Sequence, residues 1–304
     1  MNKIQYLKPG DLILIVAPAK AIEQEHVFYA KDFLESKGFN VEIGPNCLKK
    51  HYYFSGTDEE RTSDFQWAID HTEAKAILCA RGGYGSVRII DRLQWANQLR
   101  FPKWIIGFSD ITVFHNLMSV MEIPSIHGTM PLNFMTNSQQ ALDTLIQAIQ
   151  GESYTIKCPS SNFNKLGTTS GIITGGNLSI VYSLLGTDLQ PNYKNKILYL
   201  EDVGEQLYAL DRMLYSLKKA SILDQISGLI IGGMTDVKDT TTDTIGMQIE
   251  DIVLQHFEYR NIPICFNFPA GHIDDNRAVI LGKEAVLTIT ENRTELHFSS
   301  EATT

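Results

Sequence analysis

The chain is organised around Lys103-Trp-Ile-Ile-Gly-Phe-Ser-Asp-Ile-Thr112. Its apolar run, 104–107, is typical of a buried parallel strand, which is hydrophobic throughout instead of alternating. Ser109 follows almost at once, and apolar residues at helical spacing begin with Ile111. A serine at such a strand-to-helix turn presents its hydroxyl at the carboxyl edge of the sheet, among free N–H groups of the helix N-terminus.

This position gives Ser109 two interpretations. It matches the geometry of a nucleophile elbow, although the residues are Gly-Phe-Ser-Asp instead of G-x-S-x-G. Serine is also a favoured N-cap residue, so Ser109 could simply cap the helix. The segment alone leaves both interpretations open.

Composition narrows the class of protein. The 304 residues suffice for two domains, and 43% apolar with 20% charged residues is ordinary for a globular protein. A net charge of −9 argues against nucleic acid or an anionic membrane surface as the main partner. The four cysteines form no C-x-x-C pair, and no zinc pattern occurs, so we expect buried free thiols and no metal.

The polar N-terminal segment lacks the apolar core of a signal peptide, and no run approaches the roughly 18 apolar residues of a membrane span. We therefore expect a cytoplasmic protein.

Strands alternate with helices through the first half of the chain. We predict strands at 12–17, 40–43, 76–79 and 104–107, and helices at 23–37, 57–69 and 87–99. In the first helix we expect Phe28, Ala30, Phe33 and Leu34 to face inward. Such alternation predicts a doubly wound parallel sheet whose functional edge lies at the carboxyl ends of the strands.

The second half mixes its patterns. Residues 151–170 are polar and rich in loop-forming residues, so we predict an N-terminal domain at 1–155, a linker at 156–170 and a C-terminal domain at 171–304. In the C-terminal domain we predict a strand followed by a turn within 171–177, strands at 197–200 and 228–231, helices at 178–185, 208–219 and 245–257, and short strands near 278–298.

The segment Arg81-Gly-Gly-Tyr-Gly-Ser86 joins a predicted strand to a predicted helix. The lysine of a phosphate-binding loop is missing, and Arg88 stands where the third glycine of G-x-G-x-x-G would be. A turn whose N–H groups stabilise an oxyanion fits better, and Arg81 could hold a substrate carboxylate. A plain tight turn is the alternative.

Glu201 and His272 are further candidates. Glu201 ends a buried strand and needs a partner there, for which an ion pair with Arg212 is the ordinary explanation. Asp202 and Glu205 lie in the same loop as alternatives. His272 lies in a loop with turn chemistry and competes with two other histidines, His127 and His115.

Together these motifs resemble the LD-carboxypeptidase family of serine peptidases, which includes muramoyl-tetrapeptide carboxypeptidases and microcin C immunity peptidases. The motifs that carry the resemblance, in order along nearly the whole chain, are Arg81-Gly-Gly-Tyr-Gly, Gly107-Phe-Ser-Asp-Ile-Thr, Gly175-Gly-Asn177, Leu200-Glu-Asp-Val-Gly-Glu205, Asp211-Arg212, and Gly271-His272 with Asn276. The resemblance implies an N-terminal flavodoxin-like domain and a C-terminal mixed α/β domain, with the active site in the cleft between them.

The resemblance also implies residue roles. Ser109 would be the nucleophile, His272 the general base, and Glu201 the acid that orients the imidazole. The oxyanion hole would be formed by the N–H groups of Asp110 and Gly83. The substrate would be bound by residues of the glycine-rich motif, Arg81 and Tyr84.

The implied activity is removal of the terminal D-alanine from murein tetrapeptides during cell-wall peptide recycling, without a cofactor or metal. The implied partner is a small peptide substrate, and the family suggests a homodimer. One alternative is an immunity-type peptidase that hydrolyses microcin C-like aminoacyl-nucleotide antibiotics. A less favoured one is a non-catalytic sugar- or nucleotide-binding module.

Overall fold

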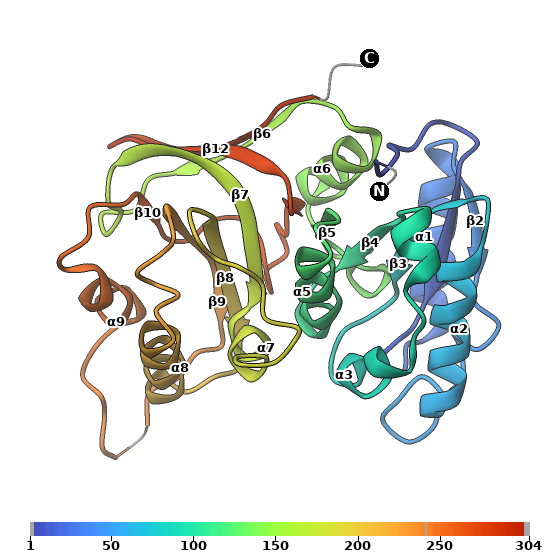
Figure 1. The fold of residues 1–304 in the computed structure, drawn as a ribbon, viewed down its shortest axis with the longest axis horizontal. Coiled ribbons are helices and arrows are strands. Elements are labelled where there is room, and N and C mark those ends of the chain that lie inside the picture. Colours follow the sequence, from blue (N-terminus) through green and yellow to red (C-terminus); the bar gives the residue numbers. More distant parts are fainter. Residues whose placement is uncertain (1–2, 241, 301–304) are drawn as a thin grey trace.

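The computed structural model describes residues 3–240 and 242–300. Two β-sheets lie side by side along the long axis of the molecule, and helices α5 (Thr112–Val120) and α7 (Leu178–Ser183) lie where they meet (Figure 1). The predicted fold class, α/β with a doubly wound parallel sheet and a mixed C-terminal part, is confirmed.

The first sheet has the strand order β11-β5-β4-β3-β1-β2. Its strands are β1 (Leu12–Val16), β2 (Asn40–Ile43), β3 (Ala74–Cys79), β4 (Trp104–Gly107), β5 (Ser125–His127) and β11 (Val279–Leu281). All neighbours pair in parallel except β11, which runs antiparallel to β5. The carboxyl ends of the five parallel strands therefore share one edge, and Ser109 follows the central strand β4.

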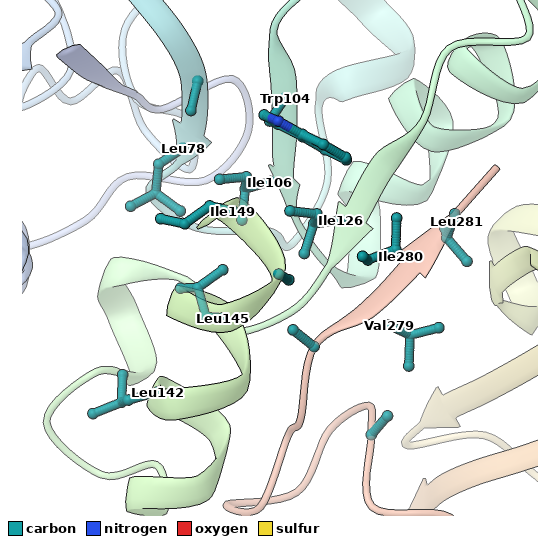
Figure 2. Packing of buried hydrophobic residues seen from close by; sticks show 14 of the residues in the cluster. Leu78, Trp104, Ile106, Ile126, Leu142, Leu145, Ile149, Val279, Ile280 and Leu281 are labelled. Atoms are coloured by element: carbon teal, nitrogen blue, oxygen red, sulfur yellow. The ribbon is translucent and has the colours of Figure 1, made fainter. Parts of the chain in front are cut away.

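Helices cover both faces of this sheet. One face packs against α1 (Gln24–Ser36) and α6 (Gln139–Gln150), and the other against α2 (Asp58–Asp70) and α5. Figure 2 shows the first of these packings, with Ile149 of α6 beside Leu78 of β3 and Ile106 of β4, and Leu145 one turn earlier in the helix. Burying both faces explains why the inner strands β1 and β4 contain no polar residue.

Two predictions for helices of the first sheet need correction. Phe28 is 44% exposed, and the buried stripe of α1 is Val27, Ala30 and Leu34, so the stripe is rotated from the predicted one. The predicted helix at 87–99 is broken into α3 (Ser86–Ile89), η1 (Ile90–Arg92) and α4 (Ala96–Arg100). The break occurs because the backbone becomes extended at Leu93, which is buried in the core.

The second sheet has the strand order β10-β9-β8-β7-β12-β13-β6. Its strands are β6 (Tyr154–Pro159), β7 (Gly167–Asn177), β8 (Ile197–Val203), β9 (Gly228–Thr235), β10 (Ile264–Cys265), β12 (Glu284–Ile289) and β13 (Arg293–Phe298). Strands β7 to β10 are parallel, and the remaining pairs are antiparallel. The other helices of the chain are α7, α8 (Leu207–Lys219), α9 (Ile249–Leu254) and the 3₁₀ segments η2 (Ser109–Ile111), η3 (Pro131–Asn133) and η4 (Gln255–Phe257).

The polar region predicted as a linker, 156–170, carries most of β6 and the start of β7. Its polar residues alternate with inward-facing ones, as expected of strands with one solvated face. The predicted helix at 245–257 also begins later than expected. Gly246 has φ +69°, a backbone conformation that an α-helix cannot contain, and α9 starts after Gln248.

The two sheets are joined by more than one connection. Strand β11 lies late in the chain yet completes the edge of the first sheet, beside β5. The loop between β10 and β11 therefore runs from the second sheet to the first, and His272 lies in this loop.

All four cysteines are free, as predicted, and Cys47, Cys79 and Cys265 are buried. Among the described residues, no helix is long and apolar enough to cross a membrane.

Candidate active site

Ser109 stands where β4 ends and η2 begins, at the strand-to-helix turn that the sequence predicted. Its backbone has φ +64°, in the left-handed region that a non-glycine residue rarely occupies. Phe108 before it is extended and buried. Backbone strain of this kind persists when the surrounding structure holds it, and it is common at functional sites.

His272 and Glu201 lie next to Ser109, although they are far from it in sequence. His272 Nε2 lies 3.1 Å from Ser109 Oγ, and His272 Nδ1 lies 2.6 Å from Glu201 Oε2. Glu201 belongs to β8 of the second sheet and is completely buried. The three side chains thus form one hydrogen-bonded chain that spans both sheets.

The backbone around His272 is fixed by several contacts. The His272 N–H also donates to Glu201 Oε2, at 3.2 Å, and Asn276 Oδ1 accepts a hydrogen bond of 2.7 Å from Gly271 N–H. Gly271 has φ +109°, and a Cβ built on it would lie 2.8 Å from Glu201 Cβ. Only glycine allows this close approach. Asn276, which the sequence showed only as part of a motif, is buried and helps to position the imidazole.

The charge of Glu201 governs the protonation of His272. Burial lowers the pKa of His272, but the hydrogen bond and charge of Glu201, with a smaller effect from Asp202, outweigh it, and the net result is a raised pKa. The alternative partner, Arg212, lies over the ring of Tyr208 at 5.5 Å and forms no ion pair with Glu201 in the described part of the chain. The ordinary explanation for Glu201 is therefore wrong.

The two competing histidines lie behind the site and not in it. His127 is fully buried, and its Nε2 lies 3.1 Å from the hydroxyl of Tyr199. His115 bridges the Gly107 carbonyl and Ser125 Oγ, each at 2.8 Å. Desolvation lowers the pKa of both imidazoles, that of His115 to about 4, so both are neutral near pH 7. His115 thereby supports the backbone two residues before Ser109.

The glycine-rich loop lies against the serine. A Cβ built on Gly82 would lie 2.9 Å from Ser109 Cβ and 3.1 Å from its Oγ, so a larger residue would collide with the serine. The Gly82 carbonyl accepts from the N–H of Lys20 at 3.3 Å, and in a trans peptide the following N–H, that of Gly83, points to the opposite side. Within the described residues, the N–H of Gly83 donates to no protein acceptor.

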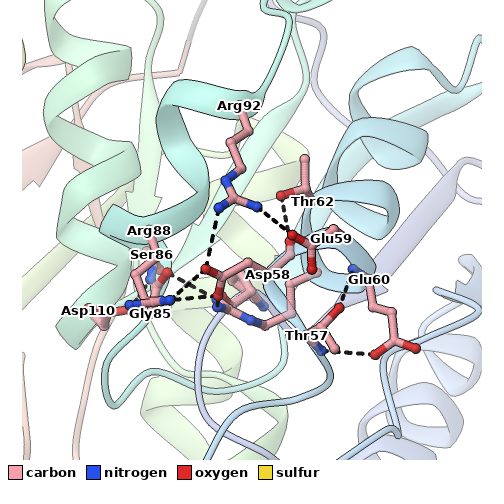
Figure 3. Close-up of polar contacts among 12 residues, drawn as sticks. Thr57, Asp58, Glu59, Glu60, Thr62, Gly85, Ser86, Arg88, Arg92 and Asp110 are labelled. Atoms are coloured by element: carbon pink, nitrogen blue, oxygen red, sulfur yellow. Dashed lines mark hydrogen bonds and ion pairs between the residues drawn. The ribbon is translucent and has the colours of Figure 1, made fainter. Parts of the chain in front are cut away.

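A charged cluster holds the glycine loop from behind. Arg61 is buried and donates to the carbonyls of Pro18 and Gly85, the latter at 3.0 Å, and it also pairs with Asp58. Figure 3 shows Arg88 and Arg92 turned toward the same carboxylate. The hydrogen bond from Arg88 and the charges of Arg61 and Arg88 hold the pKa of Asp58 below its ordinary range.

Asp110 connects this loop to the serine. Its Oδ2 accepts a hydrogen bond from the N–H of Ser86 at 2.8 Å, and its carboxylate is buried beside the turn that holds Ser109. Burial raises the pKa of Asp110. The sequence assigned Asp110 a role only through its own N–H, and its side chain adds a link between the serine turn and the end of the glycine loop.

Arg81 and Tyr84 lie at the two ends of the glycine pair. Arg81 Nη1 donates to the Ala21 carbonyl at 3.0 Å, and Tyr84 is 48% exposed with its ring 6.0 Å from that of Phe54. Neither contact excludes a substrate, but neither points to one.

The Gly175-Gly-Asn177 motif acts at the contact between the sheets. Asn177 N–H donates to Thr112 Oγ1 at 3.0 Å, and Asn177 Nδ2 donates to Asp202 Oδ1 at 3.0 Å. Asp202 also accepts from the N–H and the hydroxyl of Ser179. Asp202 is therefore held in a hydrogen-bond network next to Glu201 and does not replace it as the partner of His272.

Known proteins are similar to this chain over most of its length. The family models of the LD-carboxypeptidase N-terminal and C-terminal domains match residues 13–128 and 170–287. A putative carboxypeptidase of Synechocystis is 30% identical over 92% of this chain and 92% of its own length. The murein tetrapeptide carboxypeptidase of Pseudomonas aeruginosa is 30% identical over 90% of this chain and 92% of its own length.

Two further comparisons concern the fold and the alternative activity. The crystal structure of muramoyltetrapeptide carboxypeptidase from Oxalobacter formigenes superposes with a TM-score of 0.87 at 26% identity, covering 96% of this chain and all of that one. The microcin C7 self-immunity protein of Escherichia coli is 24% identical over 94% of this chain and 92% of its own length.

Proposed function

The chain belongs to the LD-carboxypeptidase family of serine peptidases, and from this premise we propose that it removes the terminal D-alanine from murein tetrapeptides. The family makes it a hydrolase. The observation that carries the finer proposal is the hydrogen-bonded chain from Ser109 through His272 to Glu201. The biological role that follows is recycling of cell-wall peptides.

In the proposed first step, neutral His272 accepts the proton of Ser109 through Nε2 while Oγ attacks the carbonyl carbon of the last peptide bond. The Nδ1–H of His272 is already directed at Glu201, which keeps the tautomer with Nε2 unprotonated and stabilises the imidazolium that forms. Because Glu201 is buried, its charge acts on the imidazole with little screening by water.

The carbonyl oxygen becomes an oxyanion in this step and needs donors that are already in place. The N–H of Gly83 has no protein acceptor within the described residues, and together with the N–H of Asp110 it is proposed to form the oxyanion hole. His272 then gives its proton to the amine of the leaving D-alanine. Water, activated by the same imidazole, hydrolyses the acyl-enzyme and regenerates Ser109.

A second candidate keeps the same three residues but changes the substrate. The immunity protein that resembles this chain has been crystallised with glutamyl sulfamoyl guanosine and aspartyl sulfamoyl adenosine, and at 19–20% identity those structures show a shared fold only. An aminoacyl-nucleotide substrate would use the same nucleophile and base. The two candidates differ in what occupies the leaving-group side, a D-amino acid or a nucleotide.

The test is release of free D-alanine from a murein tetrapeptide by the purified protein and by its Ser109→Ala variant. We expect release by the parent and a loss of about 10⁴-fold or more in the variant, as is typical when a triad nucleophile is removed. An aminoacyl sulfamoyl adenosine is assayed in parallel.

Equal release of D-alanine by both proteins would remove Ser109 from the mechanism. Turnover of the sulfamoyl adenosine alone would overturn the tetrapeptide in favour of the second candidate. If neither compound is turned over but sugars or nucleotides bind equally well to parent and variant, the chain is a binding module.

A further inference from the structure

Lys20 lies beside the glycine-rich loop, 81–86. The sequence analysis did not predict this contact. A Cβ built on Gly83 would lie 2.9 Å from Lys20 Cβ and 3.4 Å from Lys20 Cδ, so the side chain runs directly along this glycine. The backbone fixes the approach, because the Lys20 N–H donates to the Gly82 carbonyl. Gly82 is in turn packed against Ser109, since a Cβ built on it would lie 2.9 Å from the serine Cβ.

The ammonium group of Lys20 is held in place without being neutralised. Its Nζ lies 4.8 Å from the centroid of the Tyr53 ring, and the Tyr53 hydroxyl also faces Gly83, 2.8 Å from the built Cβ. A cation over an aromatic face is attracted by the ring but keeps its charge. Across residues 3–240 and 242–300, no carboxylate forms an ion pair with Lys20.

Arg81, the cation that the sequence suggested for this region, is used differently. Its guanidinium donates to the Ala21 carbonyl and so ties the start of the glycine loop to the segment after β1. This contact gives Arg81 a positioning role. The side chain of Lys20, the residue before Ala21, runs along Gly83, the glycine that is proposed to stabilise the oxyanion.

The chemistry of the substrate requires a cation near this point. When a peptide is attacked at its last bond, three bonds separate the scissile carbonyl carbon from the terminal carboxylate carbon, and the two atoms lie under about 4 Å apart. The group that binds the carboxylate must therefore neighbour the oxyanion donors. It should also be a hydrogen-bond donor with a full positive charge, which gives the strongest pairing with a carboxylate.

We propose that Lys20, steadied by Tyr53, binds the terminal carboxylate of the substrate and thereby restricts cleavage to the C-terminal bond. This inference rests on the proposed function, because it assigns a subsite within the same active site. It predicts that the protein distinguishes a peptide acid from the corresponding peptide amide, and that Lys20 is responsible for the distinction.

The experiment measures binding, so that it does not depend on turnover. In the Ser109→Ala background, the affinities for N-acyl-L-lysyl-D-alanine and for its C-terminal amide are compared by calorimetry, with and without Lys20→Met. Methionine keeps the apolar stem that packs on Gly83 and removes the charge. We expect Lys20→Met to weaken binding of the acid by about 10- to 100-fold, the usual effect of losing a hydrogen bond to a charged group, and to leave binding of the amide within about threefold.

Two further variants sharpen the result. Lys20→Arg should retain part of the preference for the acid, since it keeps the charge on a different geometry. Lys75→Met is the matched control, because Lys75 lies in the amino-terminal part of β3 and its Nζ donates to Gln5. It should change neither affinity.

The outcomes separate this inference from the proposed function. A parent background that does not prefer the acid, including one that binds neither compound, overturns the role of Lys20. The same holds if the preference survives in Lys20→Met, or if acid and amide weaken equally. A preference that disappears in Lys20→Met supports the role of Lys20 even if the parent fails to release D-alanine from tetrapeptides, which would overturn only the proposed function.

Discussion

Ser109 and Gly82 stand at the edge of the first sheet, whereas Glu201 belongs to the second sheet and His272 to the loop that connects the two. In the proposed mechanism, the reactivity of the serine side is prepared by backbone conformation. Ser109 has φ +64°, and Gly82 allows the loop to touch the serine side chain.

On the other side, the proposed mechanism depends on a buried charge. Glu201 is completely buried and directs one oxygen at both the imidazole and the backbone N–H of His272. His115 and His127 show how a buried imidazole without such a partner behaves, because burial is the largest effect on each and the pKa of each is lowered. The comparison teaches that the two sides of the site can be changed independently. The charge of Glu201 can be removed on one side, and the backbone strain at Ser109 can be relieved on the other.

The largest effect is expected when the charge of Glu201 is removed and the shape of its side chain is kept. We expect Glu201→Gln to lower kcat/KM by about 10⁴-fold, because the imidazolium loses its stabilising partner and the amide can favour the wrong tautomer. Measurement of kcat/KM for D-alanine release in parent and variant checks this.

The control is Asp64→Asn, which removes another buried carboxylate, one that accepts from Asn46 in the first sheet region. It should reduce stability while kcat/KM stays within a few-fold. Retention of more than a tenth of the parental kcat/KM in Glu201→Gln would show that the charge is not what prepares His272.

The next test concerns pH. A general base must be neutral to accept a proton, and the raised pKa of His272 keeps it protonated to a higher pH than a free histidine. We expect kcat/KM to fall about tenfold for each pH unit below this pKa. The midpoint of this acid limb of the pH profile should lie above the ordinary histidine pKa of about 6.5. In Glu201→Gln the acid limb of the residual activity should move to lower pH, because the effect of burial, which lowers the pKa of His272, is then the largest that remains.

Proton NMR of the His272 imidazole in Ser109→Ala supplies an independent value for comparison with the kinetic limb. An imidazole that titrates below about 6.5 in this variant would contradict the dominance of Glu201 over burial.

The two sides also differ in how far the sequence could predict them. The place of Ser109 at a strand-to-helix turn followed from an apolar run and a helical stripe, and the four strands predicted for the first half of the chain all lie in the first sheet. Its left-handed φ could not be predicted, because no local pattern requires it at a non-glycine residue. The strain depends on contacts with the glycine loop and on the support of His115 for Gly107.

The meeting of Glu201 with His272 was inferred from family resemblance and not from spacing, since the two are 71 positions apart. Local periodicity carries no information about contacts at that distance. For the same reason the addition of β11 to the first sheet was not predicted, nor was the approach of Lys20 to Gly83. The polar residues of 156–170 suggested a linker because strands with a solvated face look like loops in sequence.

The smallest effect is expected for the backbone strain at Ser109, which is tested by comparing two variants that both lack the serine hydroxyl. Ser109→Gly should be more stable to unfolding than Ser109→Ala by about 1 kcal/mol, because glycine adopts positive φ without the steric cost that alanine incurs, which outweighs the extra entropy of glycine in the unfolded chain. Urea unfolding of both variants measures the difference. The matched pair is Ser63→Gly and Ser63→Ala, at an exposed position within α2, where glycine should instead be the less stable by about 1 kcal/mol. If glycine were destabilising at both positions, the left-handed conformation of Ser109 would cost nothing, and the serine side would depend on its contacts and not on stored backbone strain.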